Sequence, residues 1–164
     1  MWTRRKNCAG KVDFILTGVM QLSDKILIVD DEPDVHDLLR VYLGRIEDVE
    51  ILSAYSGEEG VKMYKEMHEK GERPALVIMD LNLSGKEDIE LIDLHKDGMD
   101  EKLDGVRATE QILKIDPKAN IWGYTAWFDT DWAEKLKEAG VKKIVERPIS
   151  FQKFVNMVRK FLRR

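Results

Sequence analysis

From residue 24 onward, short apolar runs alternate with segments in which apolar residues recur every three or four positions. The runs at 25–29 and 75–79 are almost wholly apolar, as in strands that are buried on both faces of a sheet. Three further strands are predicted at 49–55, 120–126 and 141–145. Strands that alternate with helices in this way predict an α/β domain with a doubly wound, five-stranded parallel sheet.

The segments between these strands carry signals that begin and end helices. Pro33 suits the first turn of a helix at 33–46, and Ser56 with Glu59 forms a capping box for a second helix, which Gly71 ends. Asp104 is placed to cap a third helix at 105–115. Helices at 130–139 and from 148 to the end of the chain bring the predicted total to five.

The first 23 residues show no clean period. They are predicted to be a weakly structured N-terminal extension, which an upstream start or a cloning remnant would also explain. The domain itself is expected at 24–164, with an acidic insertion at 86–102. Within that insertion, Ile89, Leu91, Ile92 and Leu94 could line one face of a short helix. A solvated flap is the plainer interpretation, and selection of a partner kinase or gating of the site is the sharper hypothesis.

Charge is concentrated in the insertion. The chain of 164 residues has 27 basic and 31 acidic side chains and a net charge of −4. Residues 86–102 hold seven acids and three lysines, a net charge equal to that of the whole chain. This mildly acidic balance argues against nonspecific binding of nucleic acid, and no apolar run is long enough to span a membrane. Cys8, the only cysteine, excludes an internal disulfide and favours a reducing, cytoplasmic setting.

Polar residues with phosphate and metal chemistry follow the predicted strands. Asp30, Asp31, Asp80, Thr125 and Arg147 each lie at or just beyond a strand's carboxyl end, where sheets of this kind bind ligands. Three carboxylates brought together repel one another unless a cation such as Mg²⁺ bridges them. A carboxylate there could attack phosphorus and form an aspartyl phosphate, with the hydroxyl and the guanidinium as phosphate contacts. Each residue alone has a plainer role as a cap, a turn or a surface group.

Four motifs together resemble the response-regulator receiver family. They are the segment at 26–33, Ile-Leu-Ile-Val-Asp-Asp-Glu-Pro; the segment at 77–81, Val-Ile-Met-Asp-Leu; the segment at 124–126, Tyr-Thr-Ala; and Arg147-Pro148, where the family has Lys-Pro. The resemblance covers residues 24–164. It implies the flavodoxin-like receiver fold with strand order 2-1-3-4-5.

The resemblance also implies roles for individual residues. Asp80 would accept a phosphoryl group from a sensor histidine kinase or a histidine phosphotransfer protein. Asp30, Asp31 and Asp80, with the backbone carbonyl of Asn82, would hold Mg²⁺. The phosphate would be bound by Thr125, Ala126 and Arg147. Signalling would pass to an unknown output protein, with no direct contact to nucleic acid, and a homodimer could form through the fourth helix, fifth strand and fifth helix. A stand-alone receiver is expected, because no output domain follows the last helix.

Some residues depart from that family pattern. Arg147 keeps the positive charge of the family lysine but is bulkier and planar. Ile144 occupies the position of a switch aromatic, and Trp127 could overhang the site or mark a partner surface. His36 and His68 lie on predicted helices and are expected to face solvent, and the three histidines follow no metal or triad pattern.

Two other functions are therefore weighed against the signalling receiver. Arg147 and Ile144 keep open an interaction module that works without phosphorylation. An Asp-nucleophile phosphatase of the haloacid-dehalogenase type would need a second aspartate two residues after Asp80, where this chain has Asn82. Any enzymatic activity is thus expected to be limited to phosphorylation and dephosphorylation of Asp80 itself.

Overall fold

The computed structural model describes residues 2–6, 12–16 and 23–163. Five parallel strands form one sheet, in the order β4-β3-β5-β6-β7. These strands are β3 (Asp24–Val29), β4 (Val49–Ala54), β5 (Leu76–Met79), β6 (Ile121–Thr125) and β7 (Lys143–Glu146). Counted from β3, the order is the predicted 2-1-3-4-5, so the expected fold class is confirmed.

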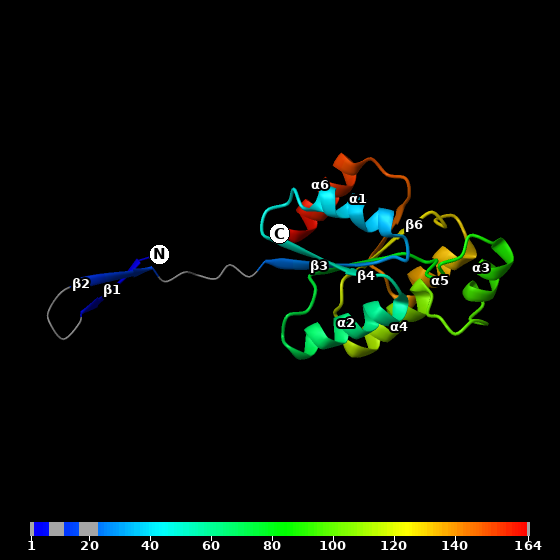
Figure 1. Ribbon diagram of the computed structural model, residues 1–164, viewed down its shortest axis with the longest axis horizontal. Helices are drawn as coiled ribbons and strands as arrows, with labels where there is room; N and C mark the ends of the chain where they lie inside the picture. Colours follow the sequence, from blue (N-terminus) through cyan, green and yellow to red (C-terminus); the bar gives the residue numbers. More distant parts are fainter. Residues whose placement is uncertain (1, 7–11, 17–22, 164) are drawn as a thin grey trace.

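Helices cover both faces of this sheet (Figure 1). On one face lie α1 and α6, and on the other lie α2, α4 and α5. Their bounds are α1 (Pro33–Leu43), α2 (Gly57–Glu69), α4 (Gly105–Ile115), α5 (Asp131–Ala139) and α6 (Phe151–Leu162). Among the described residues, no helix has the length and apolar character needed to cross a membrane.

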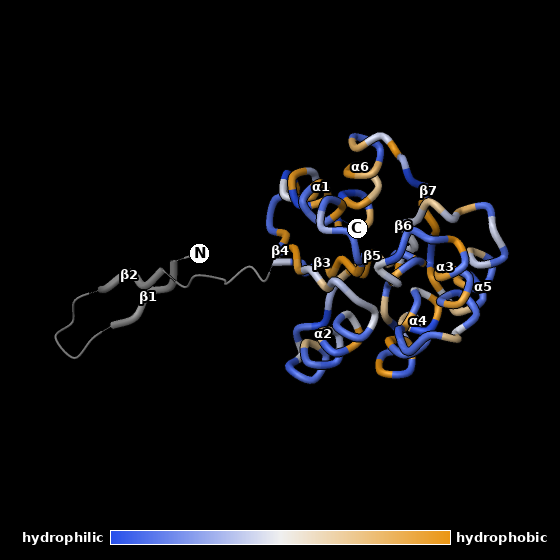
Figure 2. Tube along the Cα trace, turned by 45° about the vertical axis from the view of Figure 1, so that its right-hand side comes forward, coloured by the Kyte–Doolittle hydropathy of each residue, from blue (hydrophilic) through white to orange (hydrophobic). Residues whose placement is uncertain are grey.

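The alternation of side chains along β3 builds two cores. Ile26 and Ile28 pack toward α1 and α6, whereas Leu27 and Val29 pack toward α2 and α4. All four side chains are fully buried. Because both faces of the strand are covered, its sequence is a continuous apolar run. A third cluster forms where α5 contributes Trp132. In Figure 2 the central strands are coloured orange, for hydrophobic residues, and the surrounding helices alternate between orange and blue.

The insertion contains a sixth helix, α3 (Ile89–Lys96). The Asp88 side chain accepts hydrogen bonds from the backbone N–H groups of Glu90 and Leu91, and Gly98 adopts a φ of 72° just beyond the helix. Five helices were expected, and this short helix was only an option beside a solvated flap. The insertion packs on the domain through Ile92, in the cluster that holds Trp132, while most of residues 86–102 stay exposed to solvent.

The N-terminal extension contains one pair of antiparallel strands, β1 (Trp2–Lys6) and β2 (Val12–Leu16), where the sequence indicated no regular element. Cys8 and the remainder of the extension lie outside the described residues.

Candidate functional site

Four neighbouring strands deliver polar side chains to one edge of the sheet. Asp30 follows β3, Asp80 follows β5, Thr125 ends β6 and Arg147 follows β7. Asp30 and Asp80 are each only 2% exposed, and Thr125 is fully buried. Because parallel strands all present their carboxyl ends at the same edge, residues far apart in the sequence meet here.

Arg147 joins the two buried carboxylates. Its Nη1 lies 3.1 Å from Oδ2 of Asp30, and its Nη2 lies 3.2 Å from Oδ2 of Asp80. The guanidinium carbon also lies 5.3 Å from the ring centroid of Tyr124. This planar cation therefore pairs with both acids at once while resting on an aromatic face, a geometry that the single ammonium of a lysine does not offer.

The buried acids hold their protons more tightly than ordinary carboxyl groups. Burial, reinforced by the charge of Asp80 and opposed by that of Arg147, raises the pKa of Asp30 to about 8. Burial also raises the pKa of Asp80, to about 6, against the opposing effects of Arg147 and the Thr125 hydroxyl. The charge of Arg147 thus offsets only part of the desolvation free energy that is needed to bury two carboxylates here.

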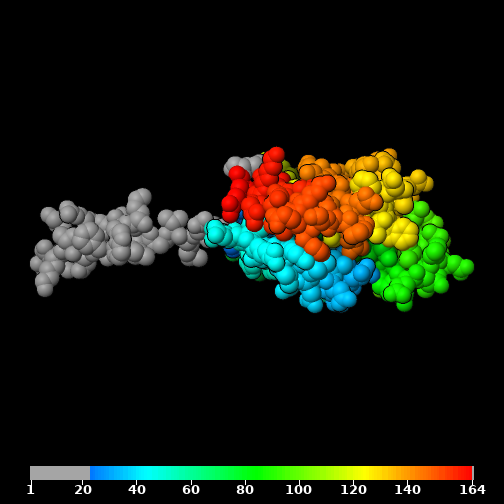
Figure 3. All heavy atoms as spheres, turned by 90° about the horizontal axis from the view of Figure 1, so that it is seen from above, coloured from blue at the N-terminus to red at the C-terminus, as the bar shows by residue number. Residues whose placement is uncertain are grey.

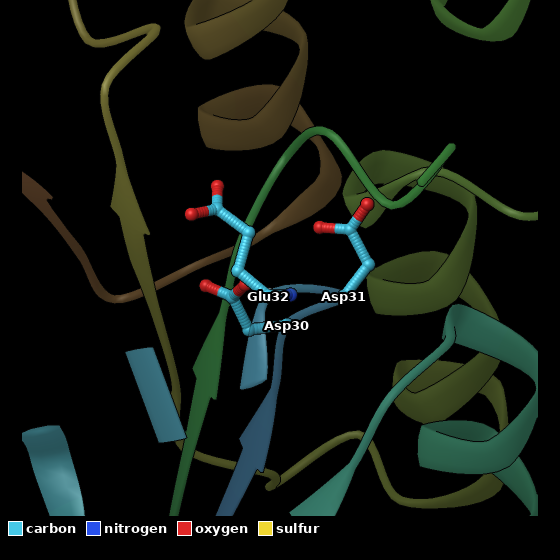
Figure 4. A group of neighbouring side chains, drawn as sticks. All are labelled: Asp30, Asp31 and Glu32. Atoms are coloured by element: carbon cyan, nitrogen blue, oxygen red, sulfur yellow. The ribbon is translucent and has the colours of Figure 1, made fainter. Parts of the chain in front are cut away.

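A group of acidic oxygens suited to a cation lies beside this pair. Ligand oxygens of Asp30, Asp31 and Glu32 lie within 4.8 Å of one another, and Figure 4 shows all three side chains leaving the turn after β3. Asp31 and Glu32 also line a hollow of about 380 Å³, with Asn82 on the opposite loop. Glu32 was not among the predicted metal ligands.

These residues fit Mg²⁺. All the donors are hard oxygens, and Oδ1 of Asp80 is buried without a hydrogen-bond partner among the described residues. A buried acceptor without a donor is costly and indicates a ligand that supplies the missing partner. Asp30, Asp31 and Asp80, with the carbonyl of Asn82, would hold the ion. When bound, Mg²⁺ would neutralise charge on a transferred phosphoryl group.

The other predicted site residues lie around these acids, Thr125 fully buried and Ala126 exposed. The hydroxyl oxygen of Thr125 accepts a hydrogen bond from the backbone N–H of Trp127 at 3.2 Å, and Ala126 between them is exposed. The ring of Trp127 packs edge-on against Trp132, with centroids 5.7 Å apart. Trp127 therefore packs against the hydrophobic cluster that contains Trp132. Asn82 accepts a hydrogen bond at 2.6 Å from the hydroxyl of Ser84, which holds the loop after Asp80 in a tight turn.

His36 hydrogen-bonds the backbone of Asp30, one of the site residues. The expectation that His36 faces solvent was wrong. It is fully buried, and its Nε2 donates to the carbonyl oxygen of Asp30 at 2.7 Å, since a carbonyl only accepts. Its Nδ1 then accepts from the Ser53 hydroxyl at 2.9 Å. The signal was present in the sequence, because His36 shares a helical face with Leu39 and Leu43. His68 remains partly exposed.

His95 ties the insertion to the loop after Asp80. It is fully buried, and its Nε2 accepts a hydrogen bond from the backbone N–H of Leu83 at 3.2 Å. Its Nδ1 therefore carries the proton and donates to Asp100 at 2.7 Å. Nothing in the local sequence identifies this contact, because its two partners are brought together only by the packing of α3.

Gly105 holds the backbone of Asp80 against α4, so Gly105→Ala is expected to destabilise the domain by about 2 to 3 kcal/mol. A β-carbon there would lie 2.0 Å from the carbonyl oxygen of Asp80, and backbone atoms cannot move aside cheaply. Urea unfolding would measure the loss. Glu110→Ala, at an exposed position on the same helix, is the control and should remain within about 0.5 kcal/mol of wild type. Equal stabilities for the two variants would contradict the prediction.

Comparison with known proteins gives a consistent match. A family model described as the response regulator receiver domain matches residues 26–159. The transcriptional regulatory protein AruR of Pseudomonas aeruginosa is 33% identical over 72 residues, which are 44% of this chain and 29% of that protein. The response regulator protein VraR of Staphylococcus aureus is 27% identical over 136 residues, which are 83% of this chain and 55% of that protein. The chain thus spans about half the length of VraR, and less of AruR.

Solved structures share the fold. A CheY-like receiver domain protein from Methanospirillum hungatei has a TM-score of 0.65 and 18% identity, over 85% of this chain and 94% of that one. A CheX-CheY-BeF3-Mg+2 complex from Borrelia burgdorferi has a TM-score of 0.64 and 20% identity, over 86% of this chain and 90% of that one.

Proposed function

The chain belongs to the response regulator receiver domain family, and from this we propose that Asp80 is its phosphoacceptor. The donor would be a phosphohistidine on a sensor histidine kinase or on a histidine phosphotransfer protein. The observation that carries the proposal is the buried Oδ1 of Asp80, which has no partner among residues 23–163 and lies on the same carboxylate that Arg147 holds through Oδ2. We assign this domain to residues 24–164.

The residues around Asp80 supply what a phosphoryl transfer needs. An Asp80 oxygen would attack phosphorus, forming a new P–O bond as the P–N bond to histidine breaks and its electron pair returns to the imidazole. Thr125, Ala126 and Arg147 would contact the phosphate oxygens, and Asp30, Asp31 and Asn82 would hold the metal. Burial of Asp80 strengthens each of these electrostatic contacts.

Phosphorylation would then shift the domain between two arrangements. Thr125 ends β6 and Arg147 follows β7, so both phosphate contacts adjoin the surface made by α5, β7 and α6. Ile144 on β7 is half-buried and cannot act as an aromatic rotamer switch. The proposal is that this surface contacts an output protein, or a second copy, within the cytoplasm.

A phosphodonor assay tests the proposal. The protein is incubated with MgCl₂ and acetyl phosphate and then weighed intact, with Asp80→Asn treated in parallel. We expect one phosphoryl group on the wild type and none on the variant. Removal of Mg²⁺ with EDTA should also abolish the adduct.

Two other outcomes would replace the proposal. No adduct under any condition favours the module that works without phosphorylation, and the pairing of Arg147 with both Asp30 and Asp80 is the observation that keeps this alternative in view. Rapid release of phosphate over many turnovers would favour the phosphatase, although Asn82 lacks the acid that such an enzyme needs.

A further inference from the structure

Apolar side chains gather on the outer surface of the insertion, around α3. Ile89, Leu91, Leu94 and Met99 are 68%, 44%, 47% and 75% exposed. They are four of the seven large hydrophobic side chains that are exposed in the described part of the chain. Single exposed apolar residues are ordinary, but a group of them on one short segment marks a binding surface. Figure 3 shows this segment, in green, at one end of the domain.

The packing of α3 does not account for these four residues. The inner side of the helix is already occupied, because Ile92 is 5% exposed and fully buried His95 is bound to Leu83 and Asp100. The helix is therefore held firmly by one side while Leu91 and Leu94 remain on another. This outward apolar surface is built on a fixed element, as recognition surfaces usually are.

A hollow of about 450 Å³ lies next to Leu91 and Leu94. The rest of its lining is polar and consists of Ser84, Lys86, Asp100, Glu101 and Lys102. The Nζ of Lys102 donates to the carbonyl oxygen of Ser84 at 2.9 Å, which fixes that part of the wall. Lys86 also lines the hollow that contains Asp31. An occupant of the α3 hollow would therefore be separated by Lys86 from the hollow that contains Asp31.

The charge around the hollow selects the kind of occupant. Residues 86–102 carry seven acids and three lysines. Glu90, Asp93 and Asp97 are exposed and form no ion pair with any residue of 23–163. A second copy of the chain would bring the same acidic surface against itself, which is unfavourable in a symmetric contact. A cationic partner gains from the seven acids of the segment, which outnumber its lysines, provided that its apolar face and not its charges lies against Lys86 and Lys102 in the hollow.

We propose that the α3 surface, made of Leu91 and Leu94 with the adjoining hollow, binds a cationic amphipathic helix of a partner protein. Its apolar residues would enter the hollow against Leu91 and Leu94, and its lysines or arginines would face the acids of α3. This binding does not depend on phosphorylation of Asp80, so the two proposals fail separately.

A synthetic helical peptide with leucines on one face and lysines on the other tests the idea. Its affinity for the full chain is measured by fluorescence anisotropy, and its position by chemical-shift changes in ¹⁵N-labelled protein. A scrambled peptide of the same composition is the control ligand. We expect the amphipathic peptide alone to bind, with shifts centred on α3, and the affinity to fall as salt is raised.

Protein variants locate the contact. Leu91→Gln/Leu94→Gln should weaken binding about tenfold, which corresponds to about 1.4 kcal/mol, because two apolar contacts are lost. Glu90→Gln/Asp93→Asn/Asp97→Asn should weaken it and flatten the salt dependence, and this variant also serves if the leucine variant folds poorly. Val41→Gln, at a position on α1 that is 61% exposed, is the matched control and should bind as wild type does.

The proposal is overturned if the scrambled peptide binds equally well, if the shifts centre on α1, or if no binding is detected. It is also overturned if the wild type self-associates in analytical ultracentrifugation and Leu91→Gln/Leu94→Gln abolishes that association. In that case the occupant is a second copy of the chain.

Discussion

Arg147→Ala is expected to destabilise the domain by about 3 kcal/mol at pH 9 in EDTA, above the pKa of both Asp30 and Asp80, where both acids are ionised. Removal of the guanidinium leaves Asp30 and Asp80 buried at 2% exposure with no cation between them. Urea unfolding measures the loss. The control is Arg40→Ala, because within residues 23–163 the Arg40 side chain donates only to the neutral hydroxyl of Ser53. A stability within about 0.5 kcal/mol of wild type would show that the ion pairs contribute nothing.

The same variant separates the structural role of Arg147 from its catalytic role. Phosphorylation by acetyl phosphate is expected to slow by a factor of about 10² to 10³, as for the loss of one charged contact in a transition state. Arg147→Lys should restore most of that rate. Because a single ammonium replaces the two separate arginine nitrogens that bind the acids, it should hold the pair less firmly, and the lysine variant should also bind Mg²⁺ several-fold more tightly in calorimetric titration. Weaker Mg²⁺ binding by the lysine variant would contradict this account.

The metal-free protein is expected to lose stability as the pH rises from about 6.5 to about 8. The pKa of Asp30 is raised to about 8, so in this window the folded state keeps a proton that the unfolded state, with an ordinary carboxyl pKa, has already released. Ionisation of Asp30 at higher pH therefore costs folding energy. Below this window His36 acts in the opposite sense, because burial lowers its pKa and protonation favours the unfolded state.

Asp30→Asn should remove most of this pH dependence and raise the melting temperature at pH 8 by several degrees. Mg²⁺ should stabilise the wild type more at pH 8 than at pH 6.5, because the ion binds the ionised carboxylates. Differential scanning calorimetry at the two pH values measures both effects. Asp129→Asn, at an exposed position, is the control. A wild-type melting temperature that rises between pH 6.5 and pH 8 would contradict the assigned role of Asp30.

Much of the fold was predictable because its signals are local. The apolar run of β3 and the capping box at Ser56 and Glu59 each specify an element without reference to the rest of the chain. The side chain of Ser56 does accept from the backbone N–H of Glu59, at 3.1 Å. Helix α3 was harder to predict, because only Ile92 and His95 of its side chains are buried and its apolar residues do not form a single inward face.

The candidate site was predictable in its membership but not in its contacts. Parallel strands present their carboxyl ends at one edge of the sheet, and this alone brings together Asp30, Asp80, Thr125 and Arg147. The distribution of one arginine between two acids depends on side-chain geometry that the sequence does not contain.

The sequence alone determined the order of strands and helices, the edge at which the polar residues meet and the concentration of acids in 86–102. The spacing of apolar residues indicates each strand or helix, and the parallel direction of the strands fixes the edge where their carboxyl ends lie. Only the tertiary structure decided that His36 supports Asp30, that His95 fastens α3 to the loop after Asp80 and that Leu91 and Leu94 are left exposed. These contacts depend on which faces of separate helices and strands pack together, and such packing joins residues that are far apart in the sequence.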